Sequence, residues 1–181
     1  MTIPARPTGP HPGAAYEPTG DPMKDGLGAA AWAEDRADRV DLTADGRPRF
    51  QPMRKLNGWS VERRHPDPRG MRVVGDDGVV AGSVVDLWVD QAEPQVRYLE
   101  VELNSDAEAS GTDRVLLPIG YARIRQRYRE VAVKALHARH FKDVPRTRTE
   151  DQVTLLEEDR IVAFYAGGYR YAEPSRNEPL F

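Results

Sequence analysis

The sequence VVDLWVDQAEPQVRYLEVEL, residues 84–103, decides the fold class of this chain. Two runs rich in branched and aromatic residues flank a short polar stretch, which is the pattern of two β-strands joined by a tight connection. In the second run, one parity carries Val96, Tyr98 and Glu100, and the other carries Arg97, Leu99, Val101 and Leu103. This alternation predicts a strand with one buried face and one face in water.

Similar short runs surround this pair: MRVVG (71–75), VVAGSVVDLWV (79–89), RVLLPIGYARI (114–124) and EVAVKAL (130–136). Asp76-Asp77-Gly78 separates the first two runs and predicts a tight hairpin turn. Pro118 lacks a backbone donor, so it should mark a corner or an edge strand. So many short strands close together predict a small antiparallel β-barrel, because closure removes exposed strand edges.

A helix is predicted after the strands. Thr154 followed by Glu157 forms a capping-box pattern, and Glu157, Glu158 and Asp159 place negative charge in the first turn, where the helix dipole favours it. Gly167-Gly168 is predicted to end this helix, because glycine is the common residue at a helix C-terminus.

The N-terminal region is predicted to be an extended arm. Six prolines fall within its first 22 residues, and they prevent helix or sheet from propagating. We expect the arm to gain order only by lying against another surface; a disordered tail is the alternative. The predicted organisation is an irregular arm (1–70), a β-barrel (71–150), and a C-terminal helix with a tail (151–181).

Composition excludes several functional classes. The 181 residues include 26 basic and 29 acidic residues and no cysteine. This near balance of charge lacks the basic excess of a nucleic-acid-binding protein, and disulfides and thiolate sites are impossible. No apolar run reaches the 18 residues that a membrane-spanning helix needs, so the chain taken alone is expected to be soluble.

The candidate reactive groups give little support for an enzyme. His137 and His140 are three residues apart, but no further ligand accompanies them at a recognised spacing, so no metal site is predicted. No nucleophile motif is present. Asp90, Glu93 and Arg97 surround the connection between the two best strands, and carboxylates near an arginine can hold and relay protons. An ordinary charged hairpin loop is the open alternative.

Five blocks carry a specific resemblance. They are GDPMKDGLGAAAW (20–32), FQPMRKLNGW (50–59), VVDLWVDQAEPQVRYLEVEL (84–103), RVLLPIG (114–120) and VTLLEEDRIVAFYAGGYRYAEP (153–174). In this order they resemble the H subunit of purple-bacterial photosynthetic reaction centres. The resemblance implies a PRC-type β-barrel with a C-terminal helix and an irregular arm, in agreement with the pattern of strands.

The resemblance also implies a non-catalytic function in electron transport. Such a subunit caps the cytoplasmic face of the L and M subunits at the photosynthetic inner membrane, stabilises the quinone sites and assists proton delivery to the secondary quinone. It binds no cofactor directly; bacteriochlorophyll, bacteriopheophytin, quinones and non-haem iron are expected in the partner subunits. Light-harvesting antenna subunits are further candidate partners.

By the same resemblance, the proton-transfer residues match Asp90, Glu93 and Arg97 here. Two histidines that serve where protons enter in some members are absent from DLTADGRPRF (41–50), and Asp45 is the candidate replacement. Family members usually begin with one membrane-spanning helix, which this sequence lacks. Either the anchor was removed, or the form is naturally soluble, or the anchor lies on another chain, so membrane contact is expected through partners or a missing anchor.

One alternative to a reaction-centre subunit remains open from the sequence. A stand-alone PRC-barrel adaptor that binds another protein has the same strands, because fold does not determine function.

Overall fold

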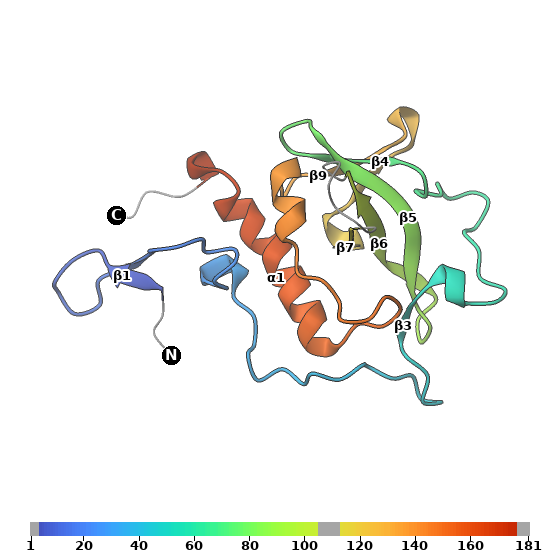
Figure 1. Cartoon of the computed structure of the whole chain (residues 1–181), viewed down its shortest axis with the longest axis horizontal. Coiled ribbons are helices and arrows are strands. Elements are labelled where there is room, and N and C mark those ends of the chain that lie inside the picture. The colour runs from blue at the N-terminus through green and yellow to red at the C-terminus, as the bar shows by residue number, and fades with distance from the viewer. Residues whose placement is uncertain (1–3, 105–112, 177–181) are drawn as a thin grey trace.

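The computed structural model describes residues 4–104 and 113–176, and this part of the chain is mainly β with one α-helix. Its main sheet has the strands β3 (Phe50–Pro52), β4 (Arg72–Gly75), β5 (Val80–Asp90), β6 (Gln95–Leu103), β7 (Arg114–Pro118), β8 (Arg123–Arg125) and β9 (Glu130–Val133). The hydrogen-bonded order is β7-β6-β5-β4-β9-β8, with β3 added to the far end of β5. The predicted fold class is confirmed (Figure 1).

Two details differ from the simple antiparallel barrel. β9 runs parallel to β4, while the other strand pairs of the main sheet are antiparallel. Within the described residues, β7 and β8 at the two ends of the order do not pair, so the sheet curls without closing. The parallel pair is possible because more than 50 residues separate β4 from β9, far more than the dozen that a crossover needs.

The predicted turns at β4–β5 and at Pro118 are confirmed. The N–H of Gly78 donates to Gly75, and Gly78 has a φ of 74°, which explains why glycine is needed there. Pro118 is the last residue of β7, the end strand of the sheet, where its missing donor costs no ladder bond inside the sheet.

The prediction of one wet face on β6 is wrong. Tyr98, Leu99, Glu100 and Val101 are all buried. Leu99 and Val101 belong to the core inside the curled sheet, whereas Tyr98 and Glu100 are covered by groups from the helix and the arm. The covering segments are distant in sequence, so the alternation alone gave no sign of them.

The helix α1 (Leu155–Tyr171) begins as predicted and ends later than predicted. The Thr154 hydroxyl accepts the N–H of Glu157 at 3.2 Å, and the Glu157 carboxylate accepts the N–H of Thr154 at 2.9 Å, which confirms the capping box. Gly167 and Gly168 lie inside the helix and not at its end. They are needed for close packing: a Cβ on Gly167 would lie 2.5 Å from the Cβ of Ala30 on the arm.

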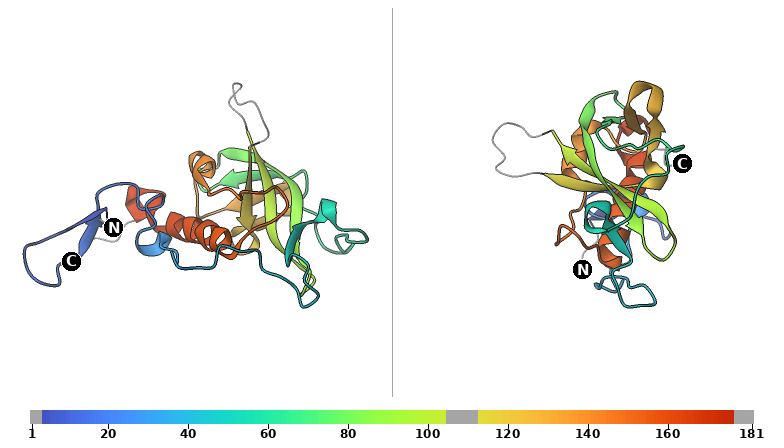
Figure 2. Two further views of the ribbon diagram at one scale, coloured as in Figure 1. Left: turned by 60° about the horizontal axis from the view of Figure 1, so that its bottom comes forward. Right: turned by 90° about the vertical axis from the view of Figure 1, so that its right-hand side faces the viewer.

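The arm has more structure of its own than predicted. β1 (Ala5–Pro7) and β2 (Tyr16–Pro18) form a two-stranded hairpin, which projects from the body in Figures 1 and 2. The short 3₁₀ turn η1 (Gly28–Ala30) then packs on α1, where the N–H of Ala33 donates to Asp159 at 2.8 Å. The prolines prevent a longer sheet, but they sit at the ends of this hairpin, where they are tolerated.

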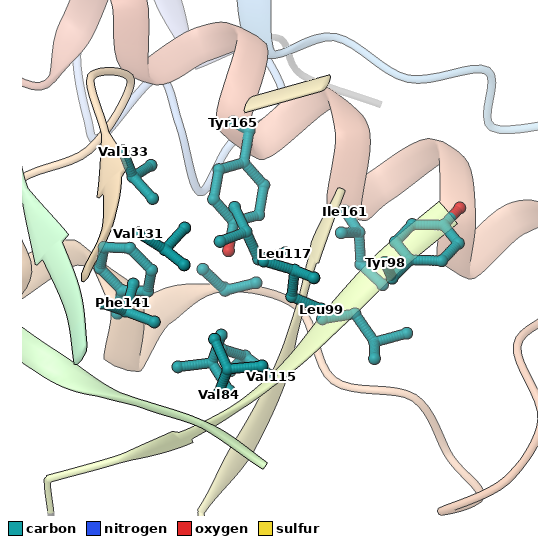
Figure 3. Packing of buried hydrophobic residues seen from close by; sticks show 14 of the residues in the cluster. Val84, Tyr98, Leu99, Val115, Leu117, Val131, Val133, Phe141, Ile161 and Tyr165 are labelled. Atoms are coloured by element: carbon teal, nitrogen blue, oxygen red, sulfur yellow. The ribbon is translucent and has the colours of Figure 1, made fainter. Parts of the chain in front are cut away.

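One hydrophobic core joins the sheet to the helix. Figure 3 shows Leu99 and Leu117 of the sheet facing Ile161 and Tyr165 of α1. All four side chains are 0% exposed. Among the described residues, no helix has both the length and the apolar character that a membrane span requires. The division at residues 70 and 150 stays a prediction, although β3 already belongs to the main sheet.

Substituting Gly167 with Ala should destabilise the fold, because the added methyl group collides with Ala30. We expect the free energy of unfolding to fall by about 1–3 kcal/mol, as for overpacking in other cores, despite the higher helix propensity of alanine. Urea unfolding measures the change. Gly120→Ala is the matched control, since a Cβ there meets nothing within 4 Å. Equal stability of the two variants would contradict the packing role.

Candidate functional site

The β5–β6 connection, together with the last residue of β5 and the first three of β6 (residues 90–97), begins with a carboxylate that has no exposed surface. Asp90 ends β5 and is 0% exposed. Arg49, just before β3, places Nε at 3.1 and 3.0 Å from its two oxygens and Nη2 at 2.9 Å from Oδ2. Phe50 lies opposite Asp90 in the strand register, which brings the guanidinium to this point. A bidentate guanidinium is the geometry that best compensates a buried carboxylate.

Asp90 also organises the backbone of the connection. Its Oδ1 accepts the N–H of Ala92 at 2.9 Å and the N–H of Glu93 at 3.1 Å. Burial alone would raise the pKa of Asp90, but the hydrogen bonds from Arg49 and from these two N–H groups outweigh it and lower the pKa. Asp90 therefore stays ionised and holds Glu93 in place.

Glu93 and Arg97, the other two residues expected to transfer protons, are exposed. The Glu93 carboxylate accepts from the amide of Gln95 at 3.1 Å, and the Arg97 guanidinium lies 5.8 Å from the centre of the Phe50 ring. The structure thus brings Asp90 and Glu93 together through a backbone bond. Arg97 belongs to β6, and its guanidinium lies over the ring of Phe50, which is the first residue of β3.

A further ionisable residue, Glu158 of α1, lies beside this connection. The phenol of Tyr98 donates a hydrogen bond to Glu158, whose side chain is only partly exposed. Burial raises the pKa of Glu158, and the opposing effects of Tyr98 and Arg97 do not cancel this rise. Burial and the nearby Glu158 likewise raise the pKa of Tyr98, so the phenol keeps its proton.

The arm, the sheet and the helix therefore meet at one ionisable junction, which we define as Asp41, Arg49, Asp90, Glu93, Arg97, Tyr98 and Glu158. Asp41 joins it through Arg49 Nη1, 3.4 Å from its carboxylate. The sequence named Glu158 only as one of three acids in a helical first turn. No local signal distinguishes it, because its neighbour Tyr98 lies 60 residues away.

Asp45, the candidate point where protons enter, lies in the exposed turn before β3. Its carboxylate accepts from the Thr43 hydroxyl and pairs with Arg47 Nε at 2.7 Å. Hydrogen bonds from Thr43 and then from Arg47 lower the pKa of Asp45. Asp45 is thus an exposed, ionised carboxylate, and its proton-uptake role stays a prediction.

A second buried ionic cluster lies farther along the same strands. Asp86 and Glu100, both nearly fully buried, share the guanidinium of Arg54, which lies 2.9 Å from Asp86. Glu100 also accepts from Arg114 at 3.1 Å and from the indole of Trp88 at 3.0 Å. Both carboxylate oxygens of Glu100 therefore accept hydrogen bonds. Among the described residues, this cluster connects β5, β6 and β7 to Arg54 and leaves no carboxylate oxygen of Glu100 free to bind a ligand.

An apolar cavity of about 480 Å³ opens beside the connection. Pro94 and Val96 form part of its wall together with Trp59, Leu99 and Ile124. A hollow of this size and character can receive an apolar side chain or a small apolar molecule.

The two histidines belong to a different part of the molecule. His137 is buried, with Nε2 2.9 Å from Glu173, and its ring stacks on that of His140. Within the described residues, no three metal-ligating side chains converge.

Comparison with protein families gives two matches in sequence order. A family described as the photosynthetic reaction centre, H-chain N-terminal region, matches residues 1–55. The PRC-barrel domain matches residues 60–138, which contain most of the main sheet and the whole β5–β6 connection.

Removing the partner of buried Asp90 should destabilise the protein strongly. Arg49→Met keeps most of the side-chain volume and leaves the carboxylate unpaired, so we expect a loss of about 3–5 kcal/mol in the free energy of unfolding. Arg47→Met is the matched control: it breaks the exposed pair with Asp45 and should cost less than about 1 kcal/mol. Denaturant titration of both variants measures the difference, and similar losses would contradict the claim that Asp90 depends on Arg49.

The raised pKa of Glu158 makes a prediction for stability against pH. The folded protein binds this proton more tightly than the unfolded chain, so the stabilisation is complete below the unfolded pKa of about 4.3 and is lost as the pH rises through the raised folded pKa. Glu158→Gln lacks the titration, so its stability relative to wild type should increase over this pH window.

Urea unfolding at a series of pH values measures this difference. Tyr98→Phe removes a hydrogen bond that lowers the pKa of Glu158, so it should move the window to higher pH. Parallel stability curves for wild type and Glu158→Gln would show that burial leaves Glu158 unperturbed.

Proposed function

We propose that this chain, which matches the reaction-centre H-chain N-terminal region over residues 1–55 and the PRC-barrel domain over residues 60–138, is an H subunit of a photosynthetic reaction centre. In that role it caps the cytoplasmic face of the L and M subunits, stabilises the quinone sites and assists proton delivery to the secondary quinone. In this proposal the chain is a non-catalytic subunit. The pigments, the quinones and the non-haem iron belong to the partner subunits, and the complex lies at the photosynthetic membrane.

The observation that carries the proton-delivery role is the partly buried Glu158 hydrogen-bonded to Tyr98 beside the β5–β6 connection. A carboxyl group whose pKa is raised by burial can take up and release a proton nearer to neutral pH than an exposed one. The hydrogen bond from Tyr98 and the charges of Arg97 and Arg49 limit that rise.

Three other carboxylates, those of Asp90, Glu93 and Asp45, have different roles in this proposal. Asp90 stays ionised and positions the backbone of Glu93, so it acts as a positioning residue. Glu93 is exposed on the connection, where its carboxylate can exchange protons with a partner or with water. Asp45 is the proposed point where protons enter; as an exposed ionised carboxylate it attracts protons without storing them.

The apolar cavity supports placing a partner on the connection. Its wall includes Pro94 and Val96, so a subunit that covers Glu93 also covers the opening. Burying this apolar surface provides association free energy next to the ionisable groups and excludes water from them.

Substituting Glu93 or Glu158 with Gln in the assembled reaction centre should slow proton-coupled electron transfer to the secondary quinone. We expect a decrease on the order of tenfold, because a relay group that cannot ionise no longer passes a proton. Flash-induced quinone reduction kinetics measure the rate. Glu34→Gln, at an exposed position on the arm, is the control and should leave the rate unchanged.

Unchanged kinetics in both variants would remove the proton role but leave the capping role intact. Co-purification tests the latter: the tagged chain should recover L and M. Recovery of neither subunit would favour a stand-alone PRC-barrel adaptor, to which the match to residues 60–138 alone is equally suited.

A further inference from the structure

The segment RIRQRYRE, which we call the basic turn (residues 123–130), concentrates positive charge on a chain whose net charge is −3. It contains four arginines and one acidic residue, Glu130. The chain forms the short strand β8, the 3₁₀ turn η4 (Gln126–Tyr128), and then β9. Clustered charge of one sign in a chain of the opposite net charge indicates a local surface with its own partner.

All four arginines of the basic turn are exposed, and within residues 4–104 and 113–176 only Arg125 has an acidic partner. Arg125 pairs with Glu130 at 3.1 Å, and Arg72 on β4 approaches the same carboxylate at 3.8 Å. Among the described residues, Arg123, Arg127 and Arg129 form no ion pair. In the part of the chain that the structure describes, three guanidinium groups of this one turn are therefore uncompensated.

The tip of the basic turn adds an aromatic side chain. Tyr128 is 60% exposed, and the Arg127 guanidinium lies 5.9 Å from its ring centre. Arginine and tyrosine are both enriched at protein interfaces, where they combine directional hydrogen bonds with a large contact area.

Protection of a sheet edge explains only part of this arrangement. β8 is the end strand of the sheet, and charged residues on an end strand such as Arg123 and Arg125 discourage edge-to-edge aggregation. Arg127, Tyr128 and Arg129 lie beyond the strand, where they protect no edge. Arg129 also adopts a left-handed backbone with φ of 50°, which glycine would adopt at lower cost.

The position of the basic turn separates it from the proposed reaction-centre face. In Figure 1 and in the right-hand view of Figure 2, η4 (gold) lies apart from the β5–β6 connection. The apolar cavity lies between them, because its wall includes Ile124 of the basic turn as well as Pro94 and Val96 of the connection. Since the proposed function places the L and M subunits, and hence the bilayer, on the connection, the tip of the basic turn (η4) points away from both, whereas Ile124 at its start lines the cavity that the subunits cover.

We propose that the basic turn is a docking site for a protein with an acidic surface, which binds on the side of the complex away from the membrane. The partner supplies clustered Asp and Glu side chains to the free guanidinium groups and a flat contact to Tyr128. The orientation relative to the bilayer rests on the proposed function, whereas the binding surface itself does not.

Binding of a fluorescent poly-L-glutamate peptide to the full chain tests the surface directly. We expect saturable binding that weakens as salt shortens the Debye length. The double variant R123E/R127E should bind at least about tenfold more weakly, which corresponds to 1.4 kcal/mol. Matched reversal of two exposed loop arginines, R63E/R64E, should leave the affinity nearly unchanged.

Two single variants separate recognition from folding. R129G keeps the left-handed backbone and removes one charge, so thermal stability should be retained while the affinity falls. Y128A should weaken binding without changing its salt dependence. Equal losses in R63E/R64E and R123E/R127E would overturn the proposal, because the binding would then follow net charge alone.

A vesicle experiment tests whether the basic turn binds a lipid surface instead of an acidic protein. Vesicles of phosphatidylcholine with phosphatidylglycerol should not bind the chain through this turn. Binding to these vesicles that R123E/R127E abolishes, together with no binding to the peptide, would identify the occupant as a lipid surface and overturn the proposal. Neither outcome depends on recovery of L and M, so failure of the docking site is distinguishable from failure of the proposed function.

Discussion

A fully buried carboxylate, Asp90, sets the condition that the rest of the structure has to satisfy. An ionised group without solvent is tolerated only when charge and hydrogen bonds replace the water, and here Arg49 supplies the charge from the arm. Arg54 meets the same need for Asp86 and Glu100 farther along the sheet. Both cations flank β3: Arg49 lies just before it and Arg54 just after it. The arm is therefore part of the folded unit and not an appendage to a complete barrel.

This constraint also determines which group in the junction can change its protonation state. The arginine and two backbone donors hold Asp90 ionised, so it provides a fixed negative charge and a fixed loop. Glu158 has a hydrogen bond from Tyr98 and partial burial in place of a bidentate cation, and its pKa moves upward. Two carboxylates in one junction thus acquire opposite shifts because their partners differ. Environments that separate the pKa values of neighbouring acids are characteristic of proton-handling sites.

Local patterns in the sequence predicted the local features correctly. The capping box at Thr154 and the turn at Gly78 involve residues a few positions apart, and both are present. Features that depend on distant segments were missed. The glycine pair predicts a helix end at Gly167, because nothing nearby in the sequence indicates that Ala30 packs against it. The wrong prediction of a wet face on β6 and the missing role of Glu158 have the same cause, since both depend on how α1 and the arm cover the sheet. The resemblance indicated the connection, but not which of its groups stay ionised.

The most direct test of this account is hydrogen–deuterium exchange of residues 91–97 in the free chain and in the assembled reaction centre. If the connection faces the L and M subunits, the amides of this segment, such as those of Ala92 and Glu93 that donate to Asp90, should exchange more slowly on assembly, because the partner suppresses the local opening that exposes them to water. The amides of residues 126–129 should exchange equally in both states. Unchanged exchange across residues 91–97, with the complex verified as intact, would contradict the placement of the ionisable junction at the reaction-centre interface.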